Sequence, residues 1–140
     1  MKTIYLITPF AAWIITGIVK FIINCFKDKK LAFHLIGYGG FPSNHSSIVS
    51  SSVSLIYFEK GLSDPSFCVA ITLAFIVFLD ANSLRRQIEM QAKAINALNQ
   101  KNKEFPKLRE RIGHSKVEIL AGAVLGIIIG AVIHFIFINI

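Results

Sequence analysis

The stretch that decides the fold is VEILAGAVLGIIIGAVIHFIFINI, residues Val117 to Ile140. Its length and apolar content are those of a helix that crosses the hydrocarbon core of a bilayer. A comparable run, Ile4 to Phe26, carries Lys20 as its single charge. The chain is 54% hydrophobic with twelve Phe, which exceeds what a soluble core of 140 residues needs. The bilayer is therefore the expected solvent for this chain.

Two further segments are weaker candidates for membrane helices. Phe67 to Leu79 is uncharged but only thirteen residues long, so neighbouring residues must complete a crossing. Ser46 to Phe58 is the weakest candidate because it contains Ser46, Ser47, Ser50, Ser51, Ser52 and Ser54. In a membrane, such a helix would turn its serines toward neighbouring helices rather than lipid.

The segment from Asp80 to about Lys103 has the composition of an amphipathic helix. Its apolar residues, at Leu84, Ile88, Ala92, Ile95 and Leu98, are spaced close to a helical stripe, and Pro106 is expected to end it. The helix would continue the third span or lie on the cytoplasmic surface. Another helix is expected to begin near Gly113 and run into the Val117–Ile140 span, where Gly122, Gly126 and Gly130 form a stripe that allows close packing.

Two local features concern the helix starts. The apolar connection from Leu31 to Phe41 contains Gly37, Gly39 and Gly40, which suit a tight turn that dips into the membrane edge. Pro42 would then lie near the first turn of the second helix, with Ser43 as its N-cap. A signal peptide is the alternative for the first run, but its length and the basic residues that follow favour a retained helix.

These patterns predict an all-α fold, a polytopic membrane helical bundle with about four transmembrane helices plus an amphipathic cytoplasmic helix. Residues 1–140 would form a single integral membrane domain. Twelve of the fifteen basic residues would lie on one side: Lys27, Lys29, Lys30, Arg85, Arg86, Lys93, Lys101, Lys103, Lys107, Arg109, Arg111 and Lys116. By the positive-inside rule that side is cytoplasmic and both termini are outside. The net charge of +7 is thus assigned to topology rather than to nucleic-acid binding.

Two motifs at the predicted cytoplasmic boundary contain histidines with polar companions, Gly39–Ser47 and Gly113–Glu118. His114 and Glu118 are four residues apart and would share a helix face. A carboxylate on one imidazole nitrogen fixes the tautomer and leaves the other nitrogen as nucleophile or base. His45 lies at an expected helix start, where free N–H groups favour an anion. The alternatives are an ordinary surface pair for His114 and a capping or interfacial role for His45.

Three cations are candidates for binding a phosphate. Lys20 lies within the first span, where a lysine costs about 2.5 to 3.5 kcal/mol unless it snorkels or pairs. It either snorkels or faces a polar pocket. Arg85 and Arg86 follow the third span, with Asp80 near its end, and suit bidentate phosphate binding, although topology alone can place arginines there.

A zinc site is the competing interpretation of the histidines. Its ligands would be His45, His114 and Glu118, with His34 as a further candidate. Their spacing matches no specific metal motif, so we expect no metal and no cofactor. His134, within the Val117–Ile140 span, is expected to be structural or lipid-facing.

The residues also carry a family resemblance. The segments Gly39–Ser46, Asp80-x-x-x-Leu84-Arg85-Arg86 with Gln91, Ala92 and Asn96, and Gly113-His114-Ser115-x-x-Glu118 with Gly122 occur in this order. Together they resemble the divergent branch of the type 2 phosphatidic acid phosphatase superfamily, which is related to vanadium-dependent haloperoxidases. The resemblance covers nearly the whole chain.

The resemblance implies roles for individual residues. His45 would be the general acid, His114 the nucleophile that forms a phosphohistidine, and Glu118 its orienting carboxylate. The phosphate would be bound by Lys20, Ser43, Asn44, Arg85 and Arg86. Asn44 stands where the wider superfamily has glycine, Glu118 where it has aspartate, and Leu108 where its third motif has arginine; the usual first motif is absent.

The implied activity is that of a metal-independent lipid phosphatase in the bacterial inner (plasma) membrane, acting on phosphatidylglycerophosphate or phosphatidic acid at the cytoplasmic face. One alternative is an undecaprenyl pyrophosphate phosphatase. Another is a non-catalytic protein that binds phospholipid headgroups, and a third is a haloperoxidase with bound vanadate. Only four or five helices are available where the superfamily usually has six, which leaves open a homodimer that completes the pocket.

Overall fold

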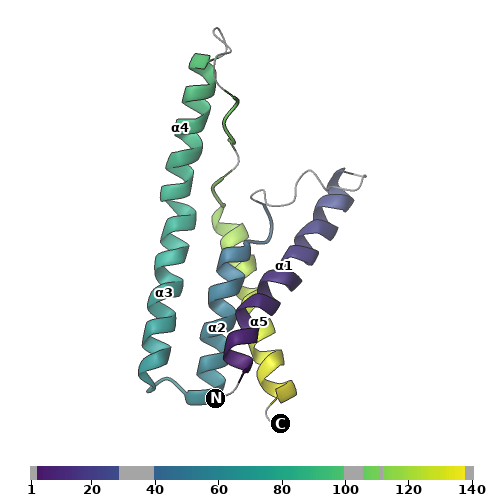
Figure 1. Ribbon diagram of the computed structural model, residues 1–140, viewed down its shortest axis with the longest axis vertical. Coiled ribbons are helices and arrows are strands. Elements are labelled where there is room, and N and C mark those ends of the chain that lie inside the picture. Colours follow the sequence, from purple (N-terminus) through teal and green to yellow (C-terminus); the bar gives the residue numbers. More distant parts are fainter. Residues whose placement is uncertain (1–2, 29–39, 100–105, 111, 138–140) are drawn as a thin grey trace.

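The computed structural model describes residues 3–28, 40–99, 106–110 and 112–137, and the regular elements in these ranges are all helices. They are α1 (Ile4–Asp28), α2 (Asn44–Lys60), α3 (Pro65–Asn82), α4 (Leu84–Asn99) and α5 (Lys116–Phe137). Figure 1 shows α1, α2, α3 and α5 alternating in direction, so the starts of α2 and α5 lie at the end of the bundle remote from the chain termini. The expected all-α class is confirmed.

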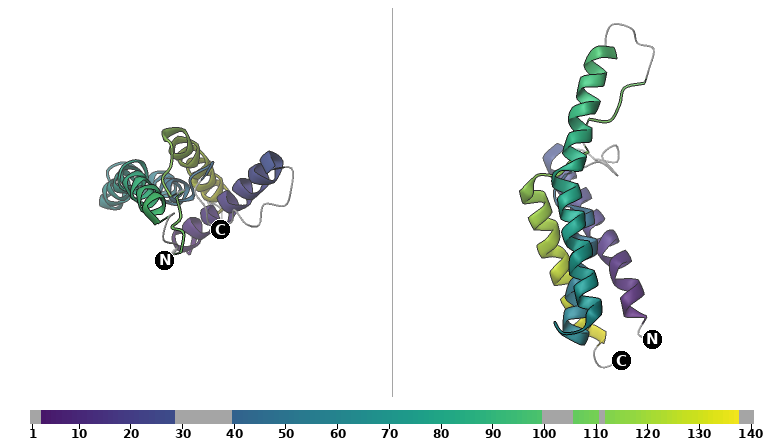
Figure 2. Two further views of the ribbon diagram at one scale, coloured as in Figure 1. Left: turned by 90° about the horizontal axis from the view of Figure 1, so that it is seen from above. Right: turned by 90° about the vertical axis from the view of Figure 1, so that its left-hand side faces the viewer.

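Three helical segments are long and apolar enough to cross a membrane: Ile4–Phe26, Pro65–Asn99 and Lys116–Phe137. The second combines α3 and α4, which form one nearly straight rod interrupted at Ser83 (Figures 1 and 2). The amphipathic helix therefore continues the third span, and α4 projects beyond the other helices. Asp64 begins the rod as an N-cap, since its Oδ1 accepts the N–H of Ser66 at 2.8 Å.

Helix α2 is shorter and more polar than the three spans, yet it lies inside the bundle and packs against α1, α3 and α5. Its buried polar residues are Ser46, Ser47, Ser50, Ser51 and Ser54. Thr16 of α1 donates its hydroxyl to Ser47 Oγ at 2.7 Å, and Ser54 donates to the carbonyl of Ile127 in α5 at 2.9 Å. The serines thus face protein, as predicted for a polar helix within a membrane.

Glycines hold α5 against α2 at backbone contact. A Cβ added at Gly122, Gly126 or Gly130 would overlap, in turn, the carbonyl oxygen of Ser43, Ser47 or Ser51. We call these six residues the glycine–serine seam. The predicted glycine stripe is confirmed as a close helix contact, and its partner is the serine face of α2.

The helix starts match the sequence expectations in part. Ser43 is the N-cap of α2, and its hydroxyl accepts the N–H of Ser46 at 3.4 Å. Pro42 directly precedes this cap and so lies near the first turn of α2, just outside it. Helix α5 begins at Lys116 rather than near Gly113. Of the turn expected from Leu31 to Phe41, residues 31–39, with Gly37 and Gly39, lie outside the described residues, and Gly40 has the positive φ of a turn glycine.

The apolar residues expected to form one stripe on α4 do not all lie on the same face. Leu84, Ile88, Ile95 and Leu98 are exposed, whereas Ala92 is buried beside Asn96 on the inner side. The helix is described as far as Asn99, so its expected continuation to about Lys103 lies outside the described residues.

His134 is not lipid-facing. It is 6% exposed, and its Nδ1 lies 2.9 Å from Oε1 of Glu59. Its ring also stacks on Phe58, with centroids 5.4 Å apart. This pair joins α2 to α5 at the end of the bundle near the termini. Of the two roles that the sequence left open for His134, structural or lipid-facing, the contacts support the structural one.

Candidate active site

Polar residues from every helix meet where α2 and α5 begin. We call this group the histidine cluster: Lys20 (α1), His45 (α2), Asp80 (α3), Arg85 (α4), Glu118 (α5) and His114, which precedes α5. Five of its six members were predicted as site residues from widely separated parts of the sequence. Asp80 was noted but not counted among them.

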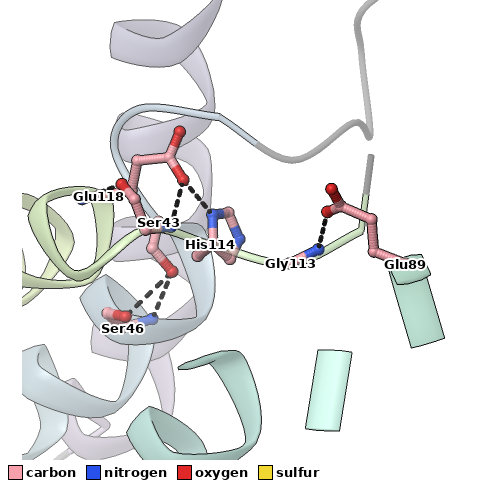
Figure 3. Close-up of polar contacts among 7 residues, drawn as sticks. Ser43, Ser46, Glu89, Gly113, His114 and Glu118 are labelled. Carbon is pink, nitrogen blue, oxygen red and sulfur yellow. Dashed lines mark hydrogen bonds and ion pairs between the residues drawn. The ribbon is translucent and has the colours of Figure 1, made fainter. Parts of the chain in front are cut away.

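The start of α2, which carries His45, is bonded to the start of α5. The N–H of Ser43 donates to the carbonyl of Glu118 at 2.9 Å, and the Ser43 hydroxyl accepts the hydroxyl proton of Ser46 at 3.0 Å (Figure 3). Because His45 is the second residue of α2, this bond sets its position relative to the residues on α5.

Glu118 has two roles at the start of α5. Its Oε2 accepts the N–H of Ser115 at 2.9 Å, while the Ser115 hydroxyl accepts the N–H of Glu118 at 3.2 Å. This reciprocal pair is a capping box. The same Oε2 lies 3.3 Å from Nδ1 of His114 (Figure 3). Since an ionised carboxylate only accepts, this contact assigns the proton of neutral His114 to Nδ1 and leaves Nε2 with a lone pair.

The two histidines lie next to each other. The ring centroids of His45 and His114 are 6.5 Å apart and the rings are tilted by 59°. His114 is only 7% exposed, whereas His45 is exposed. One ring is therefore held within protein and the other can meet a ligand arriving from outside.

The surroundings lower the pKa of both histidines below 6.5. For His45 the largest cause is partial burial of the ring, followed by the charges of Arg85, His114 and Lys20, while Asp80 opposes them. For His114, burial again lowers the pKa most, and Lys20 and Arg85 add to it, while Glu118 raises it. Two neutral imidazoles beside two cations would attract an anion.

Lys20 and Arg85 supply the positive charge of the cluster. Lys20 is 9% exposed, so its side chain lies against protein rather than reaching away along the helix. Arg85 is half-buried, and its Nε donates to Oδ2 of Asp80 at 2.6 Å. This bond orients the guanidinium, whose terminal nitrogens carry further donors suited to phosphate oxygens.

The structure places the remaining predicted phosphate ligands differently. Ser43 is buried, and its hydroxyl takes part in the α2 cap. Asn44 is half-buried, and its Oδ1 has no hydrogen-bond partner among the described residues. Arg86 is exposed and, within the described part of the chain, is not among the charges that shift either histidine.

The competing metal interpretation gains no support from the geometry. In the ranges that the structure describes, no three His, Cys, Asp or Glu side chains are grouped to hold a metal ion. His34 lies outside those ranges.

Three residues that build the site were not predicted as site residues, although Asp80 was noted. Asp80 holds Arg85, Ser115 caps α5, and Glu89 accepts the N–H of Gly113 at 3.3 Å (Figure 3). The spacing Ser-x-x-Glu at 115–118 is the usual signature of a capping box and could have identified Ser115. No sequence signal identifies Glu89, because its partner is a backbone group in another segment.

Two comparisons with known proteins give matches. The sequence model of a family described as "Divergent PAP2 family" matches residues 1–129. A protein of Bacillus subtilis (strain 168), described as uncharacterized membrane protein YuiD, is 31% identical over 149 residues, covering 94% of each chain. No solved structure matches significantly.

Proposed function

We propose that this chain, which belongs to the divergent PAP2 family, is a phosphatase that hydrolyses a phosphate monoester of a membrane phospholipid through a phosphohistidine on His114. One observation carries the proposal. Nδ1 of a buried His114 is held by Glu118, and the ring of His45 lies 6.5 Å away, close enough for one phosphoryl group to contact both rings.

In the first step, Nε2 of His114 attacks phosphorus. The N–P bond forms as the bond from phosphorus to the lipid oxygen breaks, and protonated His45 gives its proton to that oxygen, so the lipid leaves as an alcohol. In the second step, water attacks the phosphohistidine. His45 takes a proton from the water, the N–P bond breaks, and phosphate and free His114 are released.

Lys20 and Arg85 would stabilise the negative charge of the transferring phosphoryl group. Electrostatic stabilisation by preorganised cations supplies most of the catalysis in phosphoryl transfer. A bound phosphate dianion would also raise the pKa of His45, opposing the effect of the cations. His45 would therefore acquire its proton when substrate binds.

The end of the bundle with the histidine cluster would face the cytoplasm, where the positive-inside rule places the basic loops. Phosphatidylglycerophosphate and phosphatidic acid, formed in the inner leaflet, are the favoured substrates. If the cluster faced outward, undecaprenyl pyrophosphate would replace them.

A second candidate is a non-catalytic protein that binds phospholipid headgroups. The capping box favours it, because capping α5 is a sufficient structural reason for Glu118 to lie beside His114. Headgroup binding to Lys20 and Arg85 would then survive His114→Ala, and no lipid would release phosphate.

The deciding experiment measures phosphate release by detergent-purified protein from phosphatidylglycerophosphate, phosphatidic acid and isoprenoid pyrophosphate, with EDTA present. We expect EDTA-resistant release that vanadate inhibits and His114→Ala abolishes. The variant His45→Ala should lose lipid hydrolysis but still release p-nitrophenol from p-nitrophenyl phosphate in a first turnover, because that leaving group needs little protonation, while the second step, which lacks its base, stays slow. Absence of release from all lipids, with headgroup binding intact, would favour the second candidate.

A further inference from the structure

His114 lies near the end of an irregular segment that precedes α5. Residues 106–110 and 112–115, which we call the return segment, have no regular secondary structure as far as α5 and run beside α4 back to the histidine cluster (Figure 1). An irregular segment of this kind keeps its position only if its backbone groups find partners on a neighbouring element.

Asn96 of α4 binds the return segment by three hydrogen bonds. Its Oδ1 accepts the N–H of Leu108 at 2.8 Å, and its Nδ2 donates to the carbonyl of Leu108 at 2.8 Å and to Oε1 of Glu110 at 2.7 Å. Asn96 is 8% exposed. Its amide thus pairs with both backbone groups of one residue, as a neighbouring β-strand would.

Further contacts continue this attachment down to His114. Glu89 accepts the N–H of Gly113 at 3.3 Å (Figure 3), and a Cβ at Gly113 would lie only 3.2 Å from the Cα of Arg86. The N–H of His114 donates to the carbonyl of Ala81 at 3.3 Å. Ala81 lies in the last turn of α3, where carbonyl groups lack partners within the helix.

We propose that Asn96 is a positioning residue for His114, acting through the return segment from roughly 16 Å above Arg85 along α4. The inference rests on the proposed function in treating His114 as the nucleophile. Loss of the Asn96 contacts would remove three short bonds at Leu108 and Glu110, while the longer bonds at Gly113 and His114 would remain. His114 would then sample positions in which Nε2 is misaligned with phosphorus, while Lys20 and Arg85 still bind phosphate.

The test uses Asn96→Asp, which removes both donations and places a carboxylate beside that of Glu110. Adding Glu110→Gln supplies an amide that can donate to the new carboxylate, so the double variant should be partly rescued. Gln91→Glu is the matched control, because it makes the same chemical change at an exposed position of α4.

Two readouts need no turnover. Hydrogen exchange of the peptide containing Leu108, in the full-length protein, should be about tenfold faster in Asn96→Asp than in wild type or Gln91→Glu. Modification of His114 by diethylpyrocarbonate, followed by mass spectrometry, should also be faster. Unchanged exchange of the α5 peptides shows that the variant is folded. If neither rate changes, Asn96 does not position His114 and the inference is wrong.

Kinetics provide the third readout. We expect kcat to fall about 10- to 100-fold in Asn96→Asp with KM little changed, since only the alignment of the nucleophile is affected. Faster exchange with an unchanged kcat would overturn the inference while leaving the phosphatase proposal intact. Conversely, an inactive wild type whose His114 still becomes more reactive in Asn96→Asp would refute the phosphatase proposal and support the positioning role.

Discussion

The variant Gly126→Ala tests the close contact between α2 and α5 directly. The added Cβ would overlap the carbonyl oxygen of Ser47 and lie 2.8 Å from its Cα, where ordinary contact begins at 3.4 Å. The two helices must therefore separate by about 0.6 Å at that Cα and by more at the oxygen, because backbone atoms cannot rotate away as a side chain can.

The expected loss of stability follows from two opposing effects. Forcing an extra methyl group into a packed interface costs about 1 to 3 kcal/mol. Alanine has a higher helix propensity than glycine, which offsets up to about 1 kcal/mol. Separation of the helices also strains the bond from Thr16 to Ser47. We therefore expect the free energy of unfolding to fall by about 1 to 2 kcal/mol.

The assay is unfolding of the detergent-solubilised protein, followed by circular dichroism during SDS titration. Gly17→Ala is the control, because among the described residues its Cβ would meet only the Asn44 Nδ2, at an ordinary 4.0 Å. That variant should be as stable as wild type or slightly more stable. Equal stability of Gly126→Ala and Gly17→Ala would refute the assignment of a backbone contact at position 126.

Alanine substitutions at the two ends of the glycine–serine seam should both lower stability, but only one of them should affect activity. Gly122→Ala introduces the same overlap at Ser43, whose N–H donates to Glu118, so it should disturb the histidine cluster. Gly130→Ala introduces it at Ser51, toward the opposite end of the bundle. We expect both variants to be destabilised, but only Gly122→Ala should lose phosphatase activity under conditions in which both are folded.

Three further predictions concern ionisable groups. Because the pKa of His114 is lowered and its neutral form reacts, the acid limb of the kcat/KM profile should lie below pH 6.5. Arg85→Gln removes a charge that lowers this pKa, so the acid limb should move to higher pH. An unmoved limb would contradict the assignment of this limb to His114. Glu118→Gln keeps an oxygen that caps α5 but loses the carboxylate that orients His114, so kcat should fall by about 10² to 10⁴ with little change in melting temperature. His134→Ala leaves Glu59 buried without this partner and should destabilise the protein by about 3 kcal/mol in the SDS assay, whereas a loss below 1 kcal/mol would show that the pair adds little.

Much of the fold was predictable because a few strong patterns determine it. Long apolar runs can satisfy their backbone groups in a bilayer only as helices. The serines of Ser46–Phe58 must then face protein, and a stripe of glycines must face a partner. What could not be predicted was the pairing of these two faces, because neither pattern specifies which helix lies opposite.

The site was predictable in its histidines and only partly in its cations. Arg85 and Arg86 are identical neighbours in the sequence, but successive residues on a helix point about 100° apart, so only one of the two can face His45. The register of α4 after the interruption at Ser83 decides between them, and that register has no sequence signature. The Asn96 contacts were equally hidden, since an amide that binds the backbone of a remote segment leaves no periodic pattern.

The polar interior of α2 has a consequence for the order of assembly. An isolated helix with this many serines gains little free energy from entering lipid. Lys20 of α1 is unfavourable in the bilayer until it meets polar partners. Helix α5 meets the serine face of α2 at backbone contact, yet it follows α2 in the chain after the whole α3–α4 rod. In a nascent chain the serine face of α2 therefore lacks its glycine partner until α5 has been made. Enclosure of α2 and completion of the histidine cluster would then be one event, late in biogenesis.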